Sequence, residues 1–175
     1  MEEIVDILNP ITGSKTGEKI SKDEAHQKGI WHGAIHIWII SSDLKNILLQ
    51  KRCTNKKLFP NFWDISVGGH ITSGEDTLTS AKRELSEELG LDSNKYNFEY
   101  VKCIQEQFID HNIISNEFVS IYKIIADVNI ADIIMQKEEV SEVKWLSKEE
   151  FILLQKQNKI INHNEEFKMI NEILI

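Results

Sequence analysis

The chain has 175 residues, of which 41% are hydrophobic and 27% charged, a composition typical of a globular domain. A formal net charge of −8 without any block of Lys and Arg argues against a broad nucleic-acid-binding face, so we expect no nucleic-acid partner. No apolar run approaches the roughly 20 residues of a membrane span, and the acidic start is unlike a secretory signal. Cys53 and Cys103 form no C-x-x-C pair, which favours a cytoplasmic protein without a disulfide framework.

The first half of the chain is rich in strand patterns. Strands are predicted over residues 2–8, 33–41, 46–52 and 62–70. The uninterrupted apolar run of the second of these predicts a strand that is buried on both faces. Residues 9–21 are rich in turn formers, and 53–61 is expected to be a loop.

A helical period then begins. Apolar residues recur on one face at Leu78, Ala81, Leu85 and Leu89. Ser73 is the predicted N-cap, and Gly90 fits the left-handed residue that ends a helix.

The remainder predicts three strands and two helices. The strands are expected at 98–108, 116–127 and 141–146, and the helices at 147–157 and 164–174 with Ser147 and Asn164 as caps. Together these elements indicate a mixed α/β fold, and we expect residues 1–175 to form a single domain.

Three glutamates occupy one side of the first predicted helix. Glu84, Glu87 and Glu88 cover an arc of roughly 100° beside the leucine stripe, where like charges repel. A hard divalent cation takes oxygen ligands and would turn this repulsion into attraction. Three glutamates alone are more often a solvated helix face, so the surrounding residues must decide.

Those residues read GHITSGEDTLTSAKRELSEELGL over positions 69–91. This segment resembles the Nudix hydrolase signature, G-x5-E-x7-R-E-U-x-E-E-x-G-U with U aliphatic, and every defined position matches. The resemblance implies an α/β/α sandwich around a mixed sheet, and hydrolysis of a diphosphate in a small molecule with Mg²⁺ or Mn²⁺. It also implies that Glu84, Glu87 and Glu88 bind the metal. A homodimer is left open.

The resemblance gives the other signature positions supporting roles. Arg83 and Glu75 are expected to hold the motif in shape, while Gly69 and Gly90 allow close backbone turns. The catalytic base is either a signature glutamate or Glu139, on a later loop. Arg52 is either a phosphate ligand or an ordinary residue at a strand end.

The segments WHGAIHIWII (31–40), ILLQKRCTNKKLFPNFWDIS (47–66) and GGHI (68–71) resemble the isopentenyl-diphosphate-isomerase-like branch of this family. The isomerases use a cysteine at the position of Gly68, and their signature helix is degraded, whereas this one is intact. They also bind a metal through residues that His26, His32, His70 and Glu117 resemble. The interval from His26 to His32 is one residue shorter here, and Ser115 replaces a second glutamate, so a polar loop cluster is the alternative.

Three functions are therefore compared. The leading interpretation is a metal-dependent hydrolase that cleaves a diphosphate in a nucleoside diphosphate derivative or related metabolite. An isoprenoid diphosphate isomerase is opposed by Gly68. A non-catalytic diphosphate-binding module is opposed by the retention of every signature glutamate.

Overall fold

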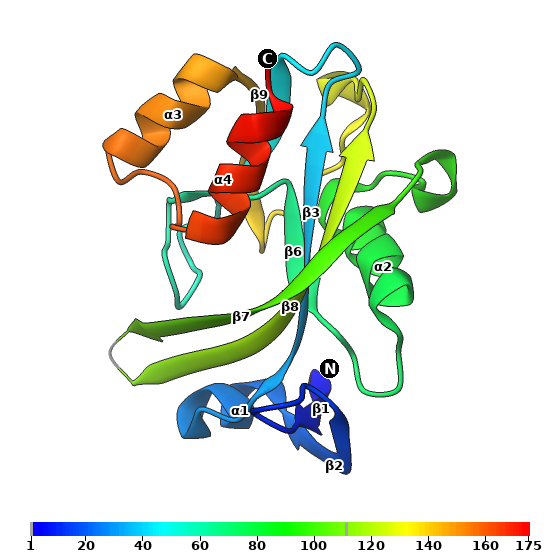
Figure 1. Ribbon diagram of the computed structural model, residues 1–175, viewed down its shortest axis with the longest axis vertical. Helices are drawn as coiled ribbons and strands as arrows, with labels where there is room; N and C mark the ends of the chain where they lie inside the picture. Colours follow the sequence, from blue (N-terminus) through cyan, green and yellow to red (C-terminus); the bar gives the residue numbers. More distant parts are fainter. Residues whose placement is uncertain (1, 111) are drawn as a thin grey trace.

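The computed structural model describes residues 2–110 and 112–175 and shows a mixed sheet between helices (Figure 1). The strands are β1 (Ile4–Leu8), β2 (Lys15–Ser21), β3 (His32–Ile40), β4 (Asn46–Arg52), β5 (Trp63–Asp64), β6 (Val67–His70), β7 (Glu99–Asp110), β8 (Ile113–Ile125) and β9 (Val140–Ser147). The helices are α1 (Lys22–Lys28), α2 (Thr77–Leu89), α3 (Lys148–Lys156) and α4 (Asn164–Ile173), with 3₁₀ turns at η1 (Ser93–Lys95) and η2 (Ile130–Asp132).

The main sheet has seven strands in the order β5-β4-β3-β8-β7, with β6 paired to β3 and β9 paired to β4. The central pair, β3 and β8, is parallel, and the other pairs are antiparallel. The predicted α/β/α sandwich is therefore confirmed. The predicted strand over 62–70 is divided into β5, which pairs with β4, and β6, which pairs with β3.

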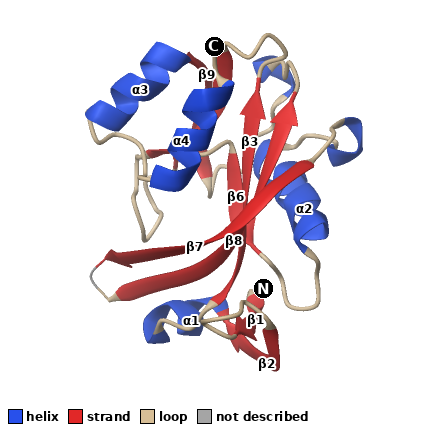
Figure 2. Cartoon of the chain, in the orientation of Figure 1, coloured by secondary structure: helices blue, strands red, loops and turns tan. Residues whose placement is uncertain are grey.

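The two faces of the sheet carry separate apolar cores. Helix α2 packs Ala81, Leu85 and Leu89 on one face, and α3 and α4 cover the other (Figure 2). Alternate residues of β3 serve both cores, as Ile37 faces α2 and Trp38 faces α4. This is why the apolar run of β3 is unbroken and all nine of its residues are buried.

The N-terminal segment differs from expectation. Residues 15–21, within the segment predicted to be rich in turns, form β2, which pairs with β1, and residues 22–28, for which no element was predicted, form α1. The residues of β2 are largely exposed, so its sequence lacks the alternation of apolar and polar residues that predicts a strand. Figure 1 shows this unit beside the start of β3, so α1 places its residues near the central strand.

Two of the predicted caps are wrong. Asp76 is the N-cap of α2 and accepts a hydrogen bond from Thr79 N, whereas Ser73 Oγ donates to Asp6 over 2.6 Å. His163 occupies the N-cap position of α4, so Asn164 is already helical. Leu78 is also misplaced in the predicted apolar face, since it is 39% exposed.

The remaining termini of the helices follow the sequence. Ser147 forms a capping box with Glu150 at the start of α3, and Gly90 ends α2 with φ of 66°. Within the described residues, no helix has the length and apolar character needed to cross a bilayer.

Candidate active-site cleft

Residues from all parts of the fold line one cleft of about 1070 Å³, and the signature glutamates form part of its wall. Helix α2 enters this wall because Gly69 of β6 carries no side chain. A Cβ at position 69 would lie 2.2 Å from Cδ of Glu84. The glycine thus makes room for a buried carboxylate, which gives a physical reason for its place in the signature.

Arg83 connects the parts of the signature. Its Nη1 donates to Glu84 Oε1 over 2.7 Å and to Glu87 Oε2 over 3.0 Å, while Nε lies 3.3 Å from Glu75 Oε2. Nη2 donates to the carbonyl of His70. Glu75 precedes α2 and accepts a hydrogen bond from Ser80 Oγ over 2.6 Å.

Glu88 points away from this arginine. Its Oε2 accepts from Gln50 Nε2 over 3.0 Å and from Gly68 N over 3.4 Å. Burial raises the pKa of Glu88 to about 8, and the neighbouring charge of Glu84 adds to the rise. Burial likewise raises the pKa of Glu84, although Arg83 opposes the shift. A positive charge bound beside these two buried acids would stabilise their ionised forms.

The opposite side of the cleft carries cations and further acids. Glu139 lies just before β9 and forms an ion pair with Lys56, a partner that the sequence did not suggest. Arg52 lines the same cleft, where its Nη1 lies 3.2 Å from Asp64 Oδ2. The structure therefore brings Glu139 and Arg52 into one cavity with the signature helix.

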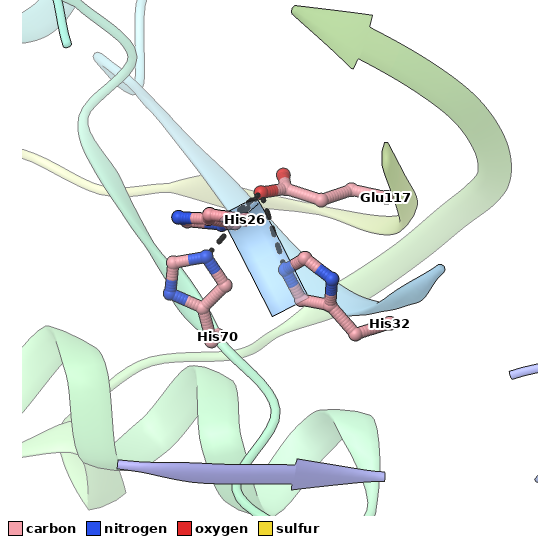
Figure 3. Close-up of side chains that lie close together, drawn as sticks. All are labelled: His26, His32, His70 and Glu117. Carbon is pink, nitrogen blue, oxygen red and sulfur yellow. Dashed lines mark hydrogen bonds and ion pairs between the residues drawn. The ribbon is translucent and has the colours of Figure 1, made fainter. Parts of the chain in front are cut away.

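A second group of the predicted residues surrounds a single carboxylate oxygen (Figure 3). Oε1 of Glu117 lies 3.7, 3.6 and 3.3 Å from the Nε2 atoms of His26, His32 and His70 respectively. A tetrahedral ion with bonds of 2.0–2.1 Å has ligand separations of about 3.4 Å. The three-histidine cluster, as we call these four residues, has nearly that spacing.

Hydrogen bonding orients the three-histidine cluster. His32 Nδ1 lies 2.8 Å from the carbonyl of Ile30, so it carries the proton and leaves a lone pair on Nε2. The Nε2 atoms of His26 and His32 are buried and have no hydrogen-bond partner. Burial lowers the pKa of His70, but hydrogen bonds with Glu117 and Glu3 outweigh it and raise the pKa to about 9.

The sequence did not single out another charged cluster on the cleft wall. It contains His36, Glu106, His163 and Glu166. The available signal was a histidine inside the apolar run of β3, but its partners come from residues 70 to 130 positions later. Among the described residues, this set and the three-histidine cluster are the groups whose potential metal ligands lie within 4.8 Å of one another. The signature glutamates do not form such a set.

With this geometry established, comparison with known proteins shows the family. The model of the NUDIX domain matches residues 31–167. The chain belongs to the Nudix family. It is 31% identical over 177 residues to the uncharacterized Nudix hydrolase lmo0368 of Listeria monocytogenes, covering 97% of this chain and 96% of that one. These findings place it among the Nudix pyrophosphohydrolases, which generally act with a divalent metal ion.

Other Nudix relatives differ in length and identity. Nudix hydrolase 3 of Arabidopsis thaliana is 39% identical over 154 residues, covering 86% of this chain, which spans only 20% of that protein. The isopentenyl-diphosphate Delta-isomerase of Serratia proteamaculans is 35% identical over 105 residues, covering 58% of this chain and 55% of the isomerase. The crystal structure of DR0079 from Deinococcus radiodurans superposes with a TM-score of 0.75 at 19% identity, covering 98% and 99% of the two chains.

Proposed function

We propose that this Nudix protein hydrolyses a diphosphate linkage in a nucleoside diphosphate derivative or a related metabolite, using Mg²⁺ or Mn²⁺ held by Glu84, Glu87 and Glu88. The observation that carries this proposal is the burial of Glu84 and Glu88 side by side in the cleft wall. Buried acids at such a site cost folding free energy, which a bound divalent cation would offset.

The donor set fits a hard cation. All three side chains supply carboxylate oxygens, and Arg83 already gathers Glu84 and Glu87 on one side. When bound, the metal would neutralise the diphosphate and lower the pKa of an attacking water. Arg83 and Glu75 then serve to hold α2 against β6, and Gly69 and Gly90 allow the backbone to approach.

Glu139 is our proposed base, and a signature glutamate is the alternative. Glu139 reaches the cleft from the loop before β9, across from α2, and Lys56 holds its carboxylate. Arg52 is the proposed phosphate contact from the β4 side. Its guanidinium is anchored by Asp64 and by the carbonyl of Leu58, so it is oriented before a ligand arrives.

A substrate screen tests the proposed reaction. Nucleoside diphosphates, nucleoside diphosphate sugars, dinucleotides and isopentenyl diphosphate are incubated with Mg²⁺ or Mn²⁺, and phosphate and monophosphate products are measured. We expect hydrolysis of at least one compound. We expect no double-bond isomerisation of isopentenyl diphosphate, because Gly68 offers no thiol. Isomerisation above the background without enzyme, or the absence of any hydrolysis, would refute the proposal.

We also propose that the three-histidine cluster binds a transition-metal ion, with Zn²⁺ or Mn²⁺ preferred over Mg²⁺. Two observations support it: the ligand spacing, and the buried, unpartnered Nε2 atoms of His26 and His32. Glu3 lies 3.5 Å from Nδ1 of His70 and would orient that ligand from behind.

Zinc titration of the metal-free protein tests this second site. We expect His32→Ala to lower zinc affinity at least tenfold, because the variant loses a buried imidazole ligand. Lys28→Ala, an exposed change on the neighbouring α1, is the control and should bind zinc as the parent does. Equal zinc affinity in His32→Ala and the parent would show that these residues form a polar cluster without a metal.

A further inference from the structure

A second charged network lies on the α4 side of β3, outside the signature. Its members are His36 of β3, Asp64 of β5, Glu106 of β7, and His163 and Glu166 at the start of α4. His36, His163 and Glu166 are respectively 7%, 3% and 0% exposed. Three strands and one helix thus contribute charged side chains to one buried place, and apart from Asp64, which anchors Arg52, the proposed reaction has not used them.

His163 is fully engaged within this network. Its Nδ1 lies 2.8 Å from Glu106 Oε1, and its Nε2 lies 3.1 Å from Asp64 Oδ1. Because a carboxylate accepts hydrogen bonds, both nitrogens donate and the ring is an imidazolium. His163 therefore serves as a fixed positive link between β5 and β7.

His36 is engaged on one edge only. Its Nδ1 lies 2.7 Å from Oε1 of Glu166, whose other oxygen accepts from the indole of Trp38. Burial lowers the pKa of His36, but the charge and hydrogen bond of Glu166 outweigh this and raise it. The ring lines the cleft, and its Nε2 makes no hydrogen bond to another described residue. Glu166 thereby orients the ring and favours its protonated form, in which Nε2 also carries an N–H that a ligand can accept.

The same side chains have the chemistry of metal ligands, but their contacts argue against a metal. Separations of 2.7 and 2.8 Å are those of charge-assisted hydrogen bonds, and both nitrogens of His163 are used. The three-histidine cluster has wider spacing and unpartnered nitrogens. In the network around His36, hydrogen bonds from the imidazole rings already pair the carboxylates, so no metal ion is needed there. The remaining edge of His36 suits an anion that accepts a hydrogen bond.

Gly68 separates His36 from the signature helix. Gly68 of β6 is the direct register partner of His36 in β3. The amide of Gly68 also donates to Glu88 Oε2 over 3.4 Å. A Cβ at position 68 would lie 3.6 Å from Cδ2 of the His36 ring. His36, Gly68 and Glu88 line the same cleft, and no side chain of residue 68 stands between them.

The charges around this part of the cleft permit an anion. Asp64, Glu106 and Glu166 are balanced by three cations, namely Arg52, His36 and His163. Each of these carboxylates is already paired with at least one of the three cations, so the network itself carries no net negative charge. A diphosphate bound through metal to Glu88 would extend toward this donor.

We propose that His36 binds a phosphate of the substrate across Gly68 from the signature glutamates, with Glu166 as its positioning residue. This subsite rests on the proposed diphosphate function. It adds a protein hydrogen-bond donor to the phosphate from the β3 side of the cleft.

The test measures binding of methylenediphosphonate, a diphosphate analogue with a non-hydrolysable P–C–P bridge, by calorimetry in Mg²⁺. His36→Gln should weaken binding at least tenfold, which corresponds to about 1.4 kcal/mol. Gly68→Ala should weaken it similarly while leaving His36 intact, because the new methyl group would lie 3.6 Å from Cδ2 of the His36 ring, on the side proposed for the phosphate.

The double variant is decisive. If both changes act on one phosphate, His36→Gln should have little further effect in the Gly68→Ala background. Gly33→Ala is the matched control, since its methyl would meet Ile71 Cδ1 at 2.8 Å much as a methyl at position 68 would meet Ile65 Cδ1 at 2.9 Å. It should bind the analogue as the parent does.

Several results would overturn the subsite: no binding by the parent, parental affinity in His36→Gln or in Gly68→Ala, or effects that multiply in the double variant. Because the analogue is not hydrolysed, the outcome is separate from the substrate screen. Hydrolysis by the parent together with unchanged analogue affinity in His36→Gln would leave the proposed function in place and remove the subsite alone.

Discussion

Glu88→Gln is expected to reduce turnover of the best diphosphate substrate by at least about 100-fold, equivalent to about 2.7 kcal/mol in the barrier. The change removes one anionic metal ligand but keeps the size of the side chain, and Gln50 can still donate to the new amide oxygen. The protein should fold, because Leu85 and Leu89, not the carboxylates, pack α2 on the sheet. Glu87→Gln should act in the same direction.

Rate, metal affinity and melting temperature are measured together for these variants. Glu142→Gln, the same chemical change on an exposed residue of β9, is the control and should match the parent. Glu139→Gln gives the contrast that identifies the base: a large fall in rate with metal affinity retained. Parental turnover in both Glu87→Gln and Glu88→Gln would mean that these carboxylates are not the metal site.

The second large effect concerns the stability of the metal-free protein. Burial raises the pKa of Glu88 from 4.5 to about 8, so the folded state favours the protonated acid. Between these values the unfolded chain loses the proton first, and the folded state therefore becomes less stable as pH rises from 4.5 toward 8. Above pH 8 this loss of folding free energy is complete, and below pH 4.5 the titration of Glu88 does not change the stability.

Thermal unfolding in chelator measures this loss as a difference between variants. From pH 5 to pH 8, the melting temperature of Glu88→Gln should rise relative to the parent by about 10 °C, since the shift is worth roughly 3 kcal/mol over this range and 1 kcal/mol corresponds to ~2–4 °C in a domain of this size. The comparison cancels the titration of histidines common to both proteins. A constant difference across this pH range would show that Glu88 is ionised in the metal-free fold.

The sequence predicted the parts of the site that lie close together in the chain. The signature occupies 23 consecutive residues, so its helix, its closing glycine and its glutamates could be read directly. Leucine periodicity also identified the buried face of α2, apart from Leu78. Local spacing could not distinguish Asp76 from Ser73 as the cap, because Ser73 is bound by Asp6 from the N-terminal unit.

Long-range pairing accounts for what remained hidden. His36 and Glu166 are 130 residues apart and meet only when α4 packs on β3. The exposed residues of β2 carry no apolar alternation, so this strand could be recognised only through its partner β1. The three-histidine cluster came from the family resemblance, and the fold shows why it is compact: His32 and Glu117 are register partners across β3 and β8.

The central claim is that the signature glutamates act through a divalent metal on a diphosphate. It is tested most directly by following hydrolysis of the best substrate in chelator and then after Mg²⁺ is restored, for the parent and Glu88→Gln in parallel. The account predicts that chelator abolishes turnover, that Mg²⁺ restores it in the parent, and that it does not do so in Glu88→Gln. Undiminished hydrolysis in excess chelator would contradict it.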